Sequence, residues 1–121
     1  MSRLFNIKVF EGWVNGTTVL YSDPAQNSQL GSADELRFQV NPDDVQGTAP
    51  VAFTMYYQCS NDALNWENNA AVLNAATVTA GASQFGNSST TATNGGFGRV
   101  ALSCEANKRV FARVWATGRS T

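Results

Sequence analysis

The sequence has no histidine and only two cysteines among its 121 residues. The lack of histidine excludes histidine-based triads, histidine general bases and histidine metal ligands. Two thiolates are too few for a zinc site by themselves. A hydrolase would need two acids held across one bond, and neither Asp34-Glu35 nor Asp43-Asp44 is placed in that way, since both pairs lie at strand or loop edges. We therefore expect a protein that is not an enzyme and that holds no cofactor or metal ion.

Charge and long apolar runs are scarce as well. Charged residues make up 14% of the chain and the net charge is -1, so no basic surplus points to nucleic acid or to an anionic membrane surface. No apolar run approaches the roughly 20 residues that span a bilayer. The segment 1–12 lacks the apolar stretch and the cleavage site of a secretory signal. We expect no nucleic-acid partner, no membrane contact and no secretory leader.

The longest apolar and aromatic stretch, residues 50–66, shows a period of two. Its odd positions from Val51 to Cys59 are apolar, which predicts a strand with one buried face. Residues 60–63 supply turn chemistry because short Asn and Asp side chains bond to nearby backbone, and Trp66 follows this turn. We predict a central hairpin here, with the other strands packed against it.

Shorter alternating segments lie on both sides of this hairpin. They cover residues 4–14, 17–22, 34–41, 70–79, 97–105 and 109–117. The pattern predicts an all-β fold, an antiparallel β-sandwich or small barrel of about seven to eight strands. We expect a single domain over residues 1–121. Small, polar and turn-forming residues predict loops at 22–33, 41–49 and 81–96.

Two tight turns have strong local signals. Asn15-Gly16 lies between β-rich flanks and predicts a type I′ hairpin of segments 4–14 and 17–22, with Gly12 as a candidate bulge. Residues 105–108 form a second predicted turn. We expect this turn to join the last two strands into another hairpin.

The last strand, 109–117, carries large side chains on both faces. Either the second sheet covers one face and a partner covers the other, or Phe111 and Trp115 belong to the core while the alanines face solvent. Segments 1–14 and 81–96 are further candidates for contacts with neighbouring molecules, with a phenylalanine as an apolar anchor in the second. The candidate contact residues are Leu4, Phe5, Phe10, Trp13, Phe85, Phe111 and Trp115.

The two cysteines, Cys59 and Cys104, each end an apolar strand face. They form either a disulfide or two buried thiols that behave as small hydrophobes, and the lack of a secretory signal favours the thiols. A catalytic thiol is not expected because no histidine is present to make a thiolate pair.

The run Tyr57–Trp66 resembles a pattern found in small β-sandwich virion proteins of tailed bacteriophages, of the head-decoration or capsid type. In those proteins a strand leads into S-x-D-G-x-x-W, and "Arg-Val-x-Leu" and "Ala-Arg-Val" strands follow. Here the later pieces are Arg99-Val100-Ala101-Leu102 and Ala112-Arg113-Val114, while Ala63 replaces the usual glycine and one extra residue precedes Trp66. The resemblance implies a virion structural protein, made in the host cytoplasm, that contacts itself and other capsid or virion proteins.

The alternative is a carbohydrate-binding or adhesion β-sandwich module. Such a module needs at least two exposed coplanar rings beside Asn, Asp or Gln. The candidates for this sugar-binding platform are Trp13, Tyr21, Tyr56, Tyr57, Trp66 and Trp115. In a β-domain of this size most aromatic side chains lie in the core or at an interface, so we favour the virion protein.

Overall fold

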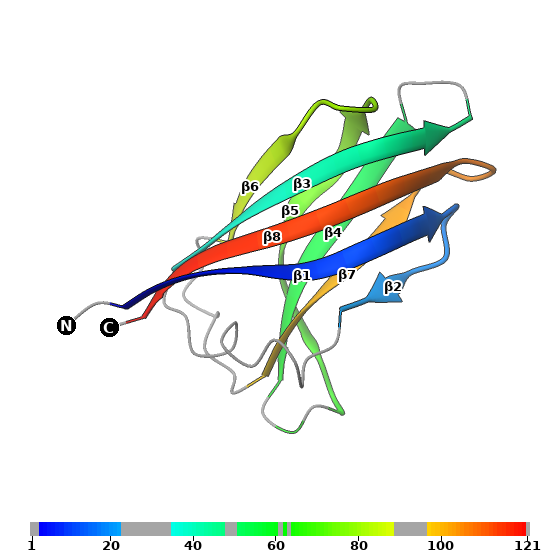
Figure 1. The fold of residues 1–121 in the computed structure, drawn as a ribbon. Coiled ribbons are helices and arrows are strands. Elements are labelled where there is room, and N and C mark those ends of the chain that lie inside the picture. The colour runs from blue at the N-terminus through cyan, green and yellow to red at the C-terminus, as the bar shows by residue number, and fades with distance from the viewer. Residues whose placement is uncertain are drawn as a thin grey trace.

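The computed structural model describes residues 3–22, 35–47, 51–60, 62, 64–88 and 97–120. Eight strands lie in these ranges (Figure 1). They are β1 (Arg3–Asn15), β2 (Leu20–Tyr21), β3 (Glu35–Gln46), β4 (Val51–Ser60), β5 (Glu67–Val78), β6 (Gln84–Ser88), β7 (Phe97–Cys104) and β8 (Arg109–Ser120). Within the same ranges the chain has no helix long and apolar enough to cross a membrane.

The strands form two antiparallel sheets of four strands each. The first sheet has the order β1-β8-β3-β6 and the second has the order β2-β7-β4-β5, and Figure 1 shows the two sheets packed as layers. Because the chain crosses between the sheets at almost every connection, its strands wrap around one core. This topology is an eight-stranded jelly roll. It confirms the predicted all-β antiparallel sandwich and the upper end of the predicted strand number.

The core lies between the sheets and is built from the period-two pattern. The odd positions of β4 are buried, as are the inward residues of β8. In β8 these inward residues are Val110, Ala112, Val114 and Ala116, all with 0% exposure. The interpretation that placed Phe111 and Trp115 in the core is therefore wrong, and both residues lie on the outer face. Each large side chain buried in this way contributes about 1.5–3 kcal/mol to stability.

The chain turns at both predicted places, but the first turn is not of the predicted type I′, because Gly16 has a positive φ and Asn15 does not. Neither turn makes a hairpin. The amide of Thr18 donates to the carbonyl of Asn15 at 3.3 Å, and the amide of Lys108 donates to the carbonyl of Glu105 at 3.2 Å. Each turn carries the chain from one sheet to the other, because β1 and β8 belong to the first sheet and β2 and β7 to the second. The two predicted hairpins are thus wrong, whereas the central hairpin of β4 and β5 is confirmed.

The two turns are bonded to each other at one end of the sandwich. The amide of Gly16 donates to the carbonyl of Lys108, and the amide of Cys104 donates to the carbonyl of Gly16, both at 2.8 Å. Gly16 has a φ of 54°, a left-handed value that glycine adopts without steric cost. The sequence thus predicted the place of the first turn, but neither its type nor the strands that it joins.

Two predicted loops contain strand. Strand β3 continues through the predicted loop 41–49 as far as Gln46, and Pro42 is tolerated because the register shifts between Pro42 and Asp44. Strand β6 lies inside the predicted loop 81–96. Residues 89–96 of that loop and residues 23–33 of the loop 22–33 lie outside the described part of the chain.

A β-bulge in β1 changes which side chains face the core. The register shifts between Lys8 and Phe10, whereas Gly12 pairs regularly with Ala112, so the prediction of a bulge at Gly12 is wrong. Strict alternation from Leu4 would put Phe10 on the outer face. The bulge instead turns Phe10 inward, where it packs against the core while remaining partly exposed.

Cys59 and Cys104 are buried at opposite ends of the second sheet. Cys104 pairs with Phe53 of β4, which is six residues from Cys59 on the same strand, or about 20 Å at the rise of a strand. This separation is far beyond the reach of a disulfide, and neither cysteine is disulfide-bonded. The Cys104 thiol donates to the carbonyl of Lys108 at 3.3 Å, and burial raises its pKa.

Candidate functional site

The outer face of the first sheet gathers four of the aromatic residues singled out from the sequence. Trp13 on β1 pairs with Phe111 on β8. Further along the sheet, Trp115 on β8 pairs with Gln39 on β3, and Gln39 pairs with Phe85 on β6. Pairing thus brings together residues that are far apart in sequence, such as Trp13 and Phe111. We call this surface the aromatic face.

One end of the aromatic face holds a cluster that we call the Trp13 cluster, formed by Trp13, Phe111 and Arg109. The rings of Trp13 and Phe111 meet edge to face, with centroids 5.4 Å apart and planes at 75°. The guanidinium of Arg109 lies 4.5 Å from the centroid of the Trp13 ring. Both rings are only partly buried. The cluster therefore offers apolar area and a positive charge at one place on the surface.

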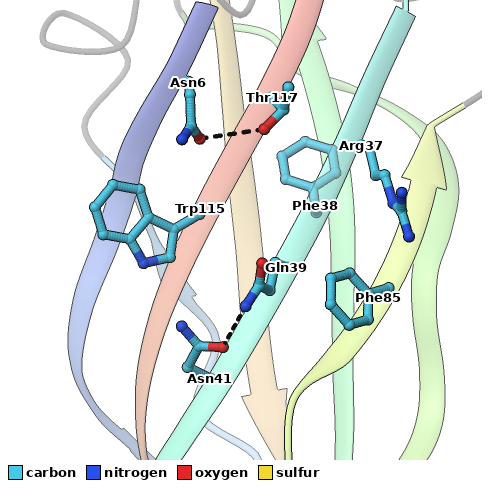
Figure 2. Close-up of a pocket in the computed structure, with 8 residues that line it drawn as sticks. All are labelled: Asn6, Arg37, Phe38, Gln39, Asn41, Phe85, Trp115 and Thr117. Atoms are coloured by element: carbon cyan, nitrogen blue, oxygen red, sulfur yellow. Dashed lines mark hydrogen bonds between the residues drawn. The ribbon is translucent and has the colours of Figure 1, made fainter.

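The other end of the aromatic face is hollowed into a groove of about 440 Å³ (Figure 2). Trp115 and Phe85 stand on either side of β3, and Figure 2 shows Gln39 and Asn41 between them. Phe85 is 53% exposed. The lining residues are Asn6, Arg37, Phe38, Gln39, Asn41, Phe85, Trp115 and Thr117.

Hydrogen bonds fix the amide side chains of this groove. Gln39 Nε2 donates to Asn41 Oδ1 at 2.9 Å and Ser83 Oγ donates to the same oxygen at 2.7 Å. Thr117 Oγ1 donates to Asn6 Oδ1 at 3.1 Å. Because these bonds use the carbonyl oxygens of both asparagines, the amide nitrogens of Asn6 and Asn41 are left to point towards the Trp115 side of the groove (Figure 2).

Most charges on the aromatic face are paired. Arg113 donates twice to the carboxylate of Asp43, from Nε at 2.6 Å and from Nη2 at 3.1 Å, and this hydrogen bonding raises the pKa of Arg113. Lys8 and Glu11 form an ion pair at 3.2 Å. The guanidinium of Arg37 lies over the Phe85 ring, 5.0 Å from its centroid. The groove is therefore close to neutral, apart from Arg37 at the Phe85 end.

The outer face of the second sheet is organised differently. The guanidinium of Arg99 on β7 lies 3.9 Å from the ring centroid of Tyr21 and 4.1 Å from that of Trp66. Its Nε donates to Gln58 Oε1 at 2.7 Å, and burial lowers the pKa of Arg99. We call this set the Arg99 cluster. The sequence analysis did not find it, because its members lie far apart in the chain and meet only once the strand order is known.

The remaining candidates from the sequence do not join these sites. Phe10 faces the core, and the side chains of Leu4 and Phe5 lie outside the described part of the structure. Asp43 is held by Arg113, and Asp34 is not among the described residues. Where side chains are described, no three of the residue types Cys, Asp and Glu gather in a way that would hold a metal ion.

Comparison with known proteins establishes the fold of the chain. No known family and no curated protein matches the sequence. Among solved structures, the PBSX exported protein XepA matches 97% of this chain and 37% of its own length, with a TM-score of 0.59 and 11% identity. A structure of T=1 particles derived from infectious bursal virus matches 98% of the chain, with a TM-score of 0.58 and 7% identity.

The VP2 subviral particle of infectious bursal disease virus also matches 98% of the chain, with a TM-score of 0.53 and 8% identity. The chain spans only about a third of the length of these neighbours, between 32% and 37%. At such low identities the likeness defines a class of fold, the antiparallel β-sandwich with jelly-roll topology.

Proposed function

We propose that the chain is a non-enzymatic structural protein of a virus particle, specifically a capsid or head-decoration protein of a tailed bacteriophage. It acts through contacts with copies of itself and with other particle proteins. The observation that carries the proposal is the aromatic face, because a folded chain rarely leaves rings such as Trp13 and Phe111 grouped on an outer sheet surface without a partner.

The structural neighbours support this proposal in a general way. Two of them are structures of viral particles, which are assembled from subunits. The same β-sandwich architecture serves many unrelated functions, so the fold alone does not assign one. What the fold adds is a rigid sheet on which the aromatic side chains keep fixed positions.

The Trp13 cluster has the composition of an interface centre. Tryptophan, tyrosine and arginine contribute most of the binding energy at protein interfaces, and they cluster near the centre of the contact. Trp13 and Arg109 match this composition, and Phe111 adds an aromatic surface beside them. Arg113 and Asp43, already paired, provide a polar rim of the kind that surrounds such a centre. The N-terminal segment 1–14 would extend the same contact along β1.

We also propose that residues 1–121 fold as a single domain. The first and last described residues pair directly, since Arg3 lies opposite Ser120 in the first sheet. Strands from the whole length of the chain contribute to both sheets. Within the described residues, neither sheet is built from one continuous part of the chain.

The test is the mass of the protein in solution, measured by light scattering and followed by negative-stain imaging of the same sample. We expect rings, trimers or shells, and we expect the double variant Trp13→Ala/Phe111→Ala to give smaller species with an unchanged circular dichroism spectrum. The matched control is Tyr56→Ala, an aromatic-to-alanine change on the outer face of the second sheet, which should assemble normally. A monomer at millimolar concentration would contradict the proposal.

A further inference from the structure

We propose that the groove between Trp115 and Phe85 is a saccharide-binding site. This inference goes beyond a structural role and does not depend on it, because the groove and the Trp13 cluster lie at different ends of the aromatic face. Trp115 and Phe111 are four residues apart on β8, or about 13 Å along the strand. The two ends are therefore separate enough to be altered independently.

The spacing of the two aromatic rings suits a sugar. Trp115, Gln39 and Phe85 lie in one row across three neighbouring strands. Strands are about 4.8 Å apart, so the two aromatic side chains leave the sheet about 10 Å from each other. This distance admits a sugar ring between them, with one apolar C–H face stacked on the indole of Trp115. The volume of about 440 Å³ is that of a small-ligand site.

The polar floor of the groove supplies what sugar hydroxyl groups require. The amide nitrogens of Asn6 and Asn41 make no hydrogen bond to another described residue, and Gln39 Oε1 accepts none. Each of these three side chains is nevertheless held in place by its other polar atom. The Oδ1 atoms of Asn6 and Asn41 accept hydrogen bonds, and Gln39 Nε2 donates one. A donor or acceptor that is already oriented loses little conformational entropy when a ligand binds.

The charge balance distinguishes a sugar from other ligands. Lys8 and Arg113 are paired with Glu11 and Asp43, and Arg37 is the one charged side chain among the residues that line the groove. The groove therefore disfavours a strongly basic peptide and suits a neutral or an acidic sugar. Amide groups and two separated rings with little net charge match a ligand that is rich in hydroxyl groups and has apolar faces. We infer that an oligosaccharide of two or three rings lies across β3.

The experiment is a titration of the full chain with maltotriose, cellotriose, chitotriose and trigalacturonic acid, monitored by tryptophan fluorescence and by the indole resonance of Trp115. We expect saturable binding of at least one of these probes. Trp115→Ala and Asn41→Ala should each weaken it at least about tenfold. Tyr56→Ala, on the outer face of the second sheet, is the matched aromatic control and should bind as the wild type does.

Because Trp115 is partly buried, Phe85→Ala is included as a variant at an exposed position whose folding is secure. It should weaken binding without changing the unfolding midpoint. Two results would overturn the proposal: no shift of the Trp115 indole resonance with any of the four probes at millimolar concentration, or unchanged affinity in both the Trp115 and Phe85 variants. Neither result bears on assembly through the Trp13 cluster, so the two proposals fail separately.

Discussion

The two outer faces of the sandwich both carry aromatic and arginine residues, yet they use them in opposite ways. On the second sheet, Tyr21 and Trp66 both contact Arg99, whose Nε is bonded to Gln58. On the first sheet, Trp115 and Phe85 stand apart on either side of β3 with a groove between them. Aromatic content therefore does not mark a binding site by itself. What distinguishes the groove is Trp115, whose ring makes no cation–π or ring contact with another described residue, whereas Arg37 lies over the Phe85 ring.

The difference follows from where the rings originate. In the Arg99 cluster Tyr21 lies on β2, which neighbours β7, whereas Trp66 lies in the connection between β4 and β5. Both rings reach the same guanidinium. In the groove the two rings lie in the same row, separated by Gln39, whose side chain is too short to fill the space between them. The first arrangement adds stability, and the second leaves a surface for another molecule.

The largest expected effect comes from comparing an inward with an outward phenylalanine of the first sheet. Phe38 has 0% exposure and packs against Tyr57 of the second sheet, with ring centroids 5.8 Å apart. We expect Phe38→Ala to lower the free energy of unfolding by about 3–5 kcal/mol through the cavity it leaves. Phe85→Ala should change it by no more than about 0.5 kcal/mol. Urea denaturation measures both, and similar losses would show that the aromatic face is part of the core.

The next effect separates the arginines of the two faces. Arg99→Ala removes two cation–π contacts, worth about 0.5–1 kcal/mol each, and one hydrogen bond of about 1 kcal/mol. We expect a loss of about 2–3 kcal/mol in the free energy of unfolding. Arg37→Ala, which removes only the contact with Phe85, is the control and should cost less than about 1 kcal/mol. Equal losses would contradict the contrast between the two faces.

A smaller effect is expected within the Trp13 cluster. A double-mutant cycle of Trp13→Ala and Phe111→Ala should give a coupling energy of about 0.5–1.5 kcal/mol, as edge-to-face aromatic pairs do. The measurement is again urea denaturation, made at a protein concentration where the variants are monomeric. The same cycle with Trp13 and Trp115, which make no ring contact in the described structure, should give a coupling close to zero. A large coupling in that second cycle would mean that the face behaves as one unit.

The smallest effect concerns the turn that leads into Trp66. The carboxylate of Asp62 accepts hydrogen bonds from the amides of Leu64 and Asn65, both at 2.9 Å, and these bonds hold the pKa of Asp62 well below its usual range. Because the pKa of Asp62 is lower in the folded state, these bonds contribute fully to stability at pH values above the pKa of the unfolded chain, about 3.9. It is lost only as the pH falls through the lower folded value.

The amide resonances of Leu64 and Asn65, followed by NMR as a function of pH, provide the measurement. They should stay constant at pH 4 and move only in more acidic solution. In Asp62→Asn, which lacks the carboxylate, the same resonances should not change with pH in this way. The Trp66 ring should also contact Arg99 less often in this variant. A titration midpoint near 4 in the wild type would contradict the hydrogen-bonded state of Asp62.

The sequence was sufficient to predict most strands and their buried faces. In β4 the alternation between Val51 and Cys59 is strict, and each predicted inward side chain is buried. The same holds for Leu36, Phe38 and Val40 in β3. A period of two depends only on the local sequence, so it predicts the buried face of a strand without knowledge of the strands that pair with it.

Strand partners and hidden strands could not be predicted in this way. The Asn15-Gly16 signal predicts a reversal of the chain at the right place. The observed turn lacks the positive φ at Asn15 that a type I′ hairpin requires, and the strands that it joins belong to different sheets. The register shift at Pro42 and the short strand β6 lie in segments whose composition is typical of loops. Their strand conformation comes from pairing with β8 and β3, which are distant in sequence.

The candidate site was predicted only in part, for the same reason. Trp13, Phe85, Phe111 and Trp115 were singled out as contact residues, but no sequence pattern indicated that Phe85 and Trp115 flank one groove. The polar members of the groove, Asn6, Gln39 and Asn41, were missed altogether. Single amide residues are common at exposed strand positions, and only the strand order β1-β8-β3-β6 brings these three together.

The position of β8 has a consequence for the newly made chain. β8 is synthesised after the other seven described strands, yet it lies in the interior of its sheet between β1 and β3. On the ribosome, β1 and β3 therefore have no partner strand at this place until residues 109–120 have emerged. Contacts between residues so distant in sequence slow folding, and open strand edges favour aggregation meanwhile. A chain that ends before β8 would present two unpaired edges, so we expect it to be recognised by chaperones or to be degraded.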